Sequence, residues 1–281
     1  MILNFIITIA ELIGGVLSGS LSLISDALHN FSDGISVILS YIALKLKSKE
    51  NTLKHTFGLK RAEILAAVIN SSVLIVISVY LFYQAAIRLM EPGEIDASIM
   101  TIVASIGLVA NVIGTILLSK DADKSMNIKS SYLHLLSDAV SSAAVIIGGL
   151  AIYFWNIYWI DPVLTILIGI YIIRESYLIL IDAIHILMEG APLNISVSEI
   201  ENEVVKIGGV DNIHHVHLWM VGENDIHIEA HIQAKDMMLS ESDNLRKSVE
   251  KLFKEKFNIN HVTLQIESLG CESADIINMS H

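Results

Sequence analysis

The sequence predicts an α-helical membrane protein, with six transmembrane helices followed by a small cytoplasmic α+β domain. Of its 281 residues, 53% are hydrophobic and only 17% are charged, whereas a soluble domain is about 25% charged. The two parts of the chain also differ in charge. Residues 1–190 carry 11 basic and 15 acidic side chains, a net charge of −4, while residues 191–281 carry 7 and 15, a net charge of −8. We therefore predict a membrane domain over 1–190 and a soluble domain over 191–281.

Six apolar stretches in the first part are long enough to be transmembrane helices, since about 20 residues of helix cross the hydrocarbon layer. They lie at about 1–18, 21–45, 62–89, 96–119, 131–155 and 160–187. The first stretch lacks the positively charged leader and the cleavage site of a signal peptide, so we expect it to be a span.

The basic residues of the short loops predict the orientation, because Lys and Arg are enriched on the cytoplasmic side. The loops after the second and fourth spans contain Lys45, Lys47, Lys49, Lys54, Lys60, Arg61, Lys120, Lys124 and Lys129. The loop after the fifth span contains neither Lys nor Arg. Both termini are therefore predicted to be cytoplasmic.

The second part is predicted to fold as helix, strand, strand, helix, strand. Alternating apolar and polar residues predict strands at about 213–221, 226–234 and 261–268. The crossover from the second strand to the third leaves room for the first strand between them. This order predicts a small ferredoxin-like sheet.

The composition excludes several classes of function. A net charge of −12, from 18 basic and 30 acidic side chains, argues against a nucleic-acid partner. A single cysteine allows neither an internal disulfide nor a Cys-rich zinc module, so histidine and carboxylate must supply any metal ligands. No H-E-x-x-H motif is present, and no Ser or Cys nucleophile accompanies a histidine base in a recognisable arrangement. The sequence is therefore not predicted to be an enzyme.

The strongest functional signal is a repeated H-x-x-S-D-x-x-S pattern in the second and fifth spans. It places His29 and Asp33 on one helix face, and His134 and Asp138 on another. Ionisable residues inside a membrane are costly and usually mark a pathway or a site. Two imidazoles and two carboxylates can bind a divalent ion tetrahedrally, Zn²⁺ above all. Alternatively, each His–Asp pair only forms hydrogen bonds inside the helix bundle and stabilises the contacts between helices. Asp26, near the same face, is a partner of the site, a proton carrier or a packing residue.

A second candidate site lies on the predicted sheet. Strand alternation leaves one polar face that carries His217, His231, His261 and Glu267. Histidines on neighbouring strands favour metal binding, although antiparallel sheets often have a solvated face without ligands. Among the histidines of this region, His214 and His227 are the weakest candidates.

These residues resemble the cation diffusion facilitator family of divalent-metal transporters, and in particular its zinc-exporting branch. The resemblance rests on the segment Ser18–Asp33, on His55-Thr-Phe-Gly-Leu-Lys-Arg-Ala-Glu63, on the His134/Asp138 pair, on Asp161-Pro162 and on His261-Val-Thr-Leu-Gln-Ile-Glu267. These motifs occur in order over nearly the whole chain.

The resemblance implies a homodimer in the inner or plasma membrane that exchanges metal ions for protons. It implies that His29, Asp33, His134 and Asp138 bind the transported ion, and that His217, His231, His261 and Glu267 bind metal in the cytoplasmic domain. No prosthetic group is expected, and zinc is the transported and regulatory ion. The loop after the second span offers only His55, so we expect no complete site there. Cys271 stands alone where some relatives carry a cysteine pair.

Two other hypotheses are open at this stage. A membrane metal sensor would use the cytoplasmic histidines while the second and fifth spans are structural. A membrane metallohydrolase would need an open coordination position, a water molecule and a general base beside the metal.

Overall fold

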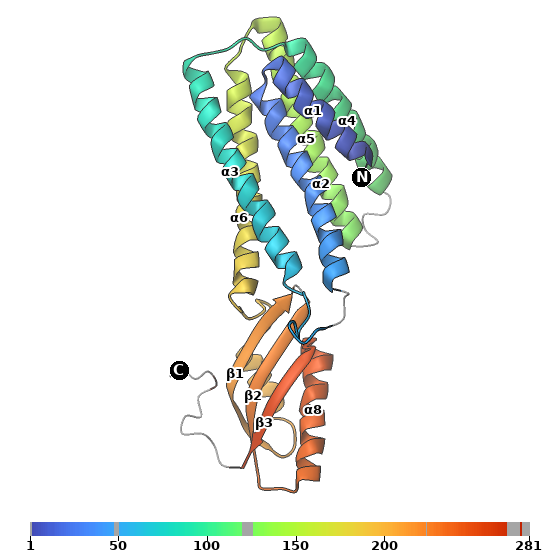
Figure 1. Cartoon of the computed structure of the whole chain (residues 1–281), viewed down its shortest axis with the longest axis vertical. Coiled ribbons are helices and arrows are strands. Elements are labelled where there is room, and N and C mark those ends of the chain that lie inside the picture. Colours follow the sequence, from blue (N-terminus) through green and yellow to red (C-terminus); the bar gives the residue numbers. More distant parts are fainter. Residues whose placement is uncertain (1, 48–50, 120–125, 223, 269–275, 277–281) are drawn as a thin grey trace. The chain divides into compact units, whose positions relative to one another are not determined.

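The computed structural model describes residues 2–47, 51–119, 126–222, 224–268 and 276. Six helices fill the first part of the chain (Figure 1). They are α1 (Ile2–Ser18), α2 (Leu21–Lys47), α3 (Ala62–Met90), α4 (Ala97–Ser119), α5 (Met126–Trp155) and α6 (Ile160–Leu187). Cys271 and three of the loop lysines, Lys49, Lys120 and Lys124, lie outside the described residues.

The chain divides into two compact units. The first contains residues 1–42 and 66–180, and the second contains residues 43–65 and 181–281. The second unit therefore includes the loop that joins α2 to α3, together with the adjoining helix ends.

Within the described part of the chain, four helices are long and apolar enough to cross a membrane: α3, α4, α6 and residues 132–155 of α5. The helix α1 is shorter, and α2 is less hydrophobic because it carries His29 and three acidic or amide side chains nearby. Large apolar side chains such as Val76, Ile102 and Ile147 are exposed on the helices, as expected for surfaces that face lipid.

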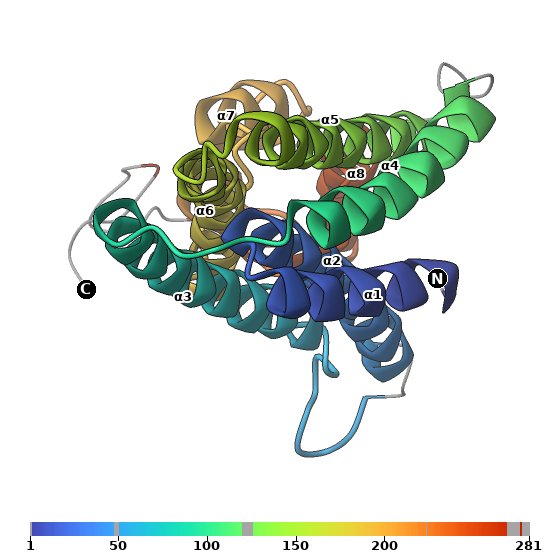
Figure 2. The same ribbon diagram turned by 90° about the horizontal axis from the view of Figure 1, so that it is seen from above.

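The interior of the first unit forms where α4 packs along α5 and α1 (Figure 2). Leu23, Met100, Ala104, Val145 and Ile152 are buried there. Ala104 is small, and small residues allow helix backbones to approach closely in membranes.

The second unit contains the C-terminal α+β domain. Its elements are α7 (Val197–Val204), β1 (Val210–Gly222), β2 (Asp225–Ala234), α8 (Leu239–Phe257) and β3 (His261–Glu267). The sheet order is β1-β2-β3, with β2 antiparallel to β1 and parallel to β3. The prediction that the first strand lies between the other two is wrong. The hydrogen bonds of β2 are made directly to β3. Helix α8 therefore connects two neighbouring strands, and β1 pairs with the other edge of β2.

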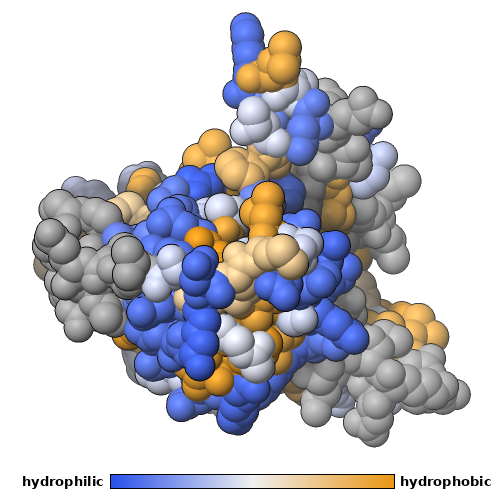
Figure 3. Space-filling view, turned by 90° about the horizontal axis from the view of Figure 1, so that it is seen from below, coloured by the Kyte–Doolittle hydropathy of each residue, from blue (hydrophilic) through white to orange (hydrophobic). Residues whose placement is uncertain are grey.

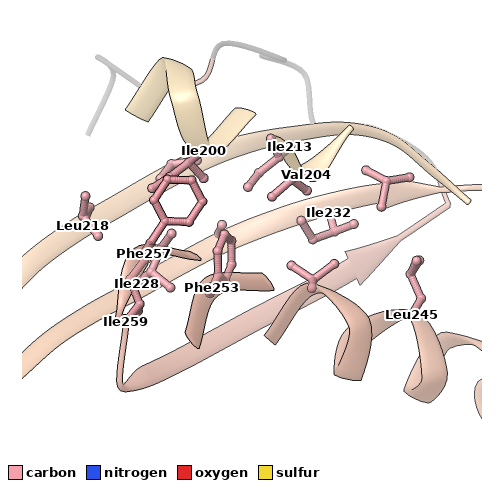
Figure 4. Close-up of a cluster of buried hydrophobic side chains, with 14 of the residues drawn as sticks. Ile200, Val204, Ile213, Leu218, Ile228, Ile232, Leu245, Phe253, Phe257 and Ile259 are labelled. Carbon is pink, nitrogen blue, oxygen red and sulfur yellow. The ribbon is translucent and has the colours of Figure 1, made fainter. Parts of the chain in front are cut away.

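One face of this sheet is covered by the two helices. Ile200 and Val204 of α7 and Phe253 of α8 pack against Ile228 and Ile232 of β2 (Figure 4). Asn258, in the left-handed conformation with φ 54°, ends α8, a role in which Asn and Gly are favoured. One face of the sheet is therefore used for folding, and the opposite face carries the histidines. Figure 3 shows the molecule from below, where hydrophilic side chains cover much of the described surface.

Candidate metal centres

The two repeated motifs meet in the first unit. His29 Nε2 lies 3.6 Å from Asp33 Oδ2 and 3.8 Å from Asp138 Oδ1. His134 Nε2 lies 3.4 Å from Asp33 Oδ2 and 3.5 Å from Asp138 Oδ2. Each histidine therefore faces the carboxylate of its own helix and that of the other helix. The structure brings together all four residues that the repeat singles out.

The spacing of these atoms suits a metal ion better than direct hydrogen bonds. Among the described residues, His29 Nε2, Asp33 Oδ2 and Asp138 Oδ1 are buried without a hydrogen-bond partner. Bonds of about 2.0–2.1 Å to a tetrahedral ion place neighbouring ligand atoms about 3.3 Å apart. The four His–carboxylate distances exceed this by at most about 0.5 Å, but no three of these residues have ligand atoms that all lie within 4.8 Å of one another, so the side chains must move inwards to bind one ion. His29 and Asp138 are largely buried while His134 is half exposed, so the group opens on one side.

The serines of the repeat fasten the two helices to their neighbours. Ser32 Oγ donates to Asn70 Oδ1 at 3.1 Å, and Asn70 Nδ2 donates to Ser36 Oγ at 2.7 Å, which joins α2 to α3. On α5, Ser137 Oγ donates to Tyr171 Oη of α6 at 3.1 Å. Hydrogen bonds between membrane helices hold their relative positions. The serines therefore orient the faces that carry the ligands.

Asp26 joins α2 directly to α5. Its Oδ1 accepts from Ser141 Oγ at 2.6 Å, and its Oδ2 accepts from Ser142 Oγ at 3.2 Å. Of the roles that the sequence left open for Asp26, this geometry favours a partner that holds the two ligand-bearing helices together. Nearby, the buried Glu11 of α1 accepts through Oε2 from Asn30 Nδ2 at 3.1 Å. The sequence assigned no role to Glu11 or Asn70, because a single polar residue shows no pattern.

Asp161 explains the Asp161-Pro162 motif. This fully buried carboxylate lies in the first turn of α6, and it binds the beginning of α2. It accepts from Ser20 Oγ at 2.6 Å, Leu21 N at 2.9 Å, and Ser22 N and Oγ at 3.1 and 2.6 Å. A carboxylate at a helix N-terminus satisfies free amides and interacts favourably with the helix dipole. Pro162 in the first turn of α6 needs no amide partner.

We expect Asp161→Asn to destabilise the membrane unit by about 2–3 kcal/mol, because charge-assisted hydrogen bonds are lost and a buried amide group cannot accept at its nitrogen. The midpoint of thermal unfolding in detergent measures the change. The control is Asp96→Asn, since the exposed Asp96 accepts from two amides at the beginning of α4 and Asn is an equally good N-cap. Equal midpoints for the two variants would contradict this role of Asp161.

The polar face of the C-terminal sheet carries its histidines in rows across the strands. Trp219, His227 and His261 form one row, and His214, His231 and Gln265 form another. Glu267, two residues beyond Gln265 in β3, reaches both histidines of the second row: its Oε2 lies 3.5 Å from His231 Nδ1, and its Oε1 lies 2.9 Å from His214 Nε2. His214, His231 and Glu267 offer ligand atoms that all lie within 4.8 Å of one another. This group is the candidate metal site of the sheet.

The four residues expected on this face do not converge in one chain. His231 and Glu267 come together, but His261 lies at the other end of β3, about 20 Å from Glu267 for six residues of strand. His261 stacks on His227 instead, with ring centroids 4.5 Å apart. The ring of His217 lies 5.5 Å from that of His215. Within one chain, His217, His231, His261 and Glu267 therefore do not form a single cluster.

A β-bulge explains why His214 belongs to the candidate metal site although the sequence ranks it among the weakest ligands. The pairing of β1 with β2 shifts between His214 and His217, and His215 has φ 56°. An extra residue in one strand reverses the alternation beyond it, so both His214 and His217 lie on the polar face. The signal is present in the sequence, since the core residues Ile213, Val216 and Leu218 are spaced by three and then by two.

His55 lies in the loop between α2 and α3, within the second unit. It lines a cavity of about 910 Å³ together with His217, Trp219 and Glu229 of the sheet. Lys60 Nζ, 2.9 Å from Asp225 Oδ1, attaches the loop to the C-terminal domain, and Arg61 lies 3.0 Å from Glu189, just after α6. Among the described residues, the group of three close ligands on the sheet does not include His55.

A helical membrane unit with two His–Asp pairs facing each other, followed by a histidine-rich α+β domain, defines a membrane protein that handles divalent metal ions. The chain belongs to the cation efflux family of transporters. Residues 1–188 match the family's transmembrane domain, and residues 192–269 match the cytoplasmic domain of cation efflux proteins.

Characterised relatives cover most of the chain. It is 40% identical over 263 residues to a cadmium, cobalt and zinc/H(+)-K(+) antiporter of Bacillus subtilis, which covers 92% of this chain and 84% of the relative. It is 33% identical to the metal cation efflux system protein CzcD of Cupriavidus metallidurans and 32% identical to the zinc transporter ZitB of Escherichia coli, each over 95% of this chain, and over 84% and 85% of those relatives.

Proposed function

We propose that this protein exports zinc by exchanging it for protons, with the ion bound by His29, Asp33, His134 and Asp138. The observation that carries the proposal is the convergence of two His–Asp pairs from α2 and α5. The histidine Nε2 atoms lie 3.4–3.8 Å from the carboxylate oxygens, and several of these ligand atoms are buried without a hydrogen-bond partner among the described residues. Two nitrogen and two oxygen ligands favour a borderline divalent ion. Relatives named as zinc transporters and as a metal/proton antiporter support the choice of ion and of exchange.

We further propose a homodimer in the cell membrane, with both termini and the domain 191–281 in the cytoplasm. The basic loops support this orientation, and the match to a cation efflux cytoplasmic domain supports the placement. Domain 191–281 would bind regulatory zinc at His214, His231 and Glu267. We propose no enzymatic reaction and no prosthetic group.

Zinc uptake into everted vesicles or proteoliposomes tests the function. The purified full-length chain should move Zn²⁺ into the lumen against its gradient when the lumen is acidic. A metal sensor would bind zinc without moving it, and a metallohydrolase would not move it either. Zinc binding without flux would overturn the proposal in favour of the sensor.

His29→Asp is expected to reduce the preference for zinc over manganese. The change replaces a borderline nitrogen ligand by a hard oxygen, and oxygen ligands suit Mn²⁺ better. Competition between Zn²⁺ and Mn²⁺ in the uptake assay measures the ratio. His55→Asp is the matched control, because His55 lies outside the site and its replacement should leave the ratio unchanged. An unchanged ratio in His29→Asp would show that His29 does not select the ion.

A further inference from the structure

The imidazole ring of His29 lies in the membrane site without a hydrogen bond that would fix its direction. Both of its ring nitrogens are buried and have no hydrogen-bond partner among the described residues. Metal-binding histidines are usually oriented by a hydrogen bond from the second ring nitrogen to a carboxylate, a carbonyl group or water. Since no described residue makes that bond to His29, the direction of its ring depends on the side chains that pack against it.

Two rings pack edge-on against His29. One belongs to His134, itself a proposed ligand, with ring centroids 6.1 Å apart and 70° between the planes. The other belongs to Tyr171 of α6, also at 6.1 Å, with 82° between the planes. Perpendicular contacts at this distance lie within the preferred geometry of aromatic pairs. Of these two rings, Tyr171 is the one that lies outside the proposed ligand set.

The hydroxyl group of Tyr171 reaches the other half of the site. Its Oη accepts a hydrogen bond from Ser137 Oγ at 3.1 Å, and Ser137 directly precedes the proposed ligand Asp138 in α5. All of these residues belong to the first compact unit. A single side chain of α6 therefore contacts the motif of α2 through its ring and the motif of α5 through its hydroxyl.

We propose that Tyr171 is a positioning residue for the transported ion, which keeps Nε2 of His29 directed at the two aspartates and links that ring to α5 through Ser137. The inference rests on the ion site proposed above. Ligands are held in a productive geometry when neighbouring side chains lock their rotamers. Packing by Tyr171 would thus provide the orientation that a hydrogen bond on Nδ1 provides in other metal sites.

This role predicts an effect on the choice of ion. Imidazole suits zinc, whereas manganese prefers oxygen ligands. If the ring of His29 is free to turn its Nε2 away, the site keeps both aspartates but loses part of a nitrogen ligand. Zinc binding should then weaken more than manganese binding. A loss of helix packing alone would weaken the binding of both ions alike.

Tyr171→Leu tests the ring contact. We expect this change to raise the KM for zinc by about tenfold, as when residues that support metal ligands are removed, with little change in kcat. The preference for Zn²⁺ over Mn²⁺ in competition uptake should fall. Tyr171 is 41% exposed, so its replacement should leave the helices packed, and the midpoint of thermal unfolding without zinc checks this. Tyr177→Leu, a change of an exposed tyrosine on the same helix, is the matched control and should alter neither quantity.

The hydroxyl contact is tested from both of its ends. Tyr171→Phe keeps the ring against His29 and removes only the hydrogen bond to Ser137, and Ser137→Ala removes the same bond while leaving Tyr171 and all four ligands in place. Each change should raise the KM for zinc by about threefold, the effect of one ordinary hydrogen bond. The double variant should show no further rise, because two changes that break one shared bond are not additive.

The outcomes separate this inference from the proposed function. Normal KM and ion preference in a folded Tyr171→Leu protein, or equal losses for zinc and manganese, would overturn the positioning role while zinc export stands. If Tyr171→Leu does not fold, unchanged KM values in Tyr171→Phe and Ser137→Ala, or additive effects in the double variant, would overturn the link across the site. A lack of zinc flux in the unaltered protein would instead overturn the proposed function.

Discussion

Asp138→Asn is expected to abolish zinc transport and to weaken zinc binding at the membrane site by about 100-fold or more. Asp138 is 5% exposed and approaches both histidines, His29 through Oδ1 and His134 through Oδ2. The change to an amide removes the negative charge and leaves three ligands, and a neutral carboxamide is a poor ligand for zinc. The shape of the side chain is unchanged, so the helices should remain folded.

The measurement combines zinc uptake into proteoliposomes with calorimetric titration of the detergent-solubilised protein. Asp182→Asn is the matched control, because Asp182 is exposed on α6 and takes no part in the site. It should transport zinc at the normal rate. Unchanged zinc uptake by a folded Asp138→Asn protein would disprove the four-ligand site.

Zinc movement should be accompanied by protons in the opposite direction. Histidine has an ordinary pKa of about 6.5, and zinc binds only neutral imidazole and ionised carboxylate, so metal occupancy and protonation of the site exclude each other. Metal loading must then release protons, and protonation on the other side must release metal. For each exchanged proton, one pH unit across the membrane supplies about 1.4 kcal/mol, which equals about a tenfold zinc gradient.

A pH-sensitive dye trapped in zinc-transporting vesicles measures this exchange. An acidic lumen should accelerate zinc uptake, and the uptake should raise the luminal pH. Vesicles that contain Asp138→Asn should show neither flux, which separates coupled exchange from proton leakage. Zinc flux that ignores an imposed pH gradient and moves no protons would establish a uniporter while leaving the metal site in place.

The local sequence is sufficient to predict the membrane helices and the ligands of the membrane site, but not the residues that surround this site. Apolar stretches of about 20 residues identify the membrane helices, because lipid permits little else. The i, i+4 spacing places His29 with Asp33 and His134 with Asp138, since helix geometry alone determines that they share a face. The repeated motif then predicts the ligand set before any helix is placed in space.

The surroundings of the site are not visible in the sequence. Asp161 holds the beginning of α2 from about 140 residues away, and Asn70 bridges two serines of α2 from α3. Each of these is a single polar residue without a pattern. Their roles appear only when the helices are packed, because a hydrogen bond between distant segments depends on their positions in space and not on local spacing.

The sheet shows the same division. By itself, the sequence determined which strands form and that one face carries histidines, because a strand alternates its side chains with a period of two. Only the tertiary structure decided which histidines meet. The bulge at His215 moved His214 onto the polar face, and the direct pairing of β2 with β3 placed His261 beside His227, on which it stacks. Local periodicity sets the direction of a side chain, whereas strand register and order, which are set by packing of the whole domain, decide its neighbours.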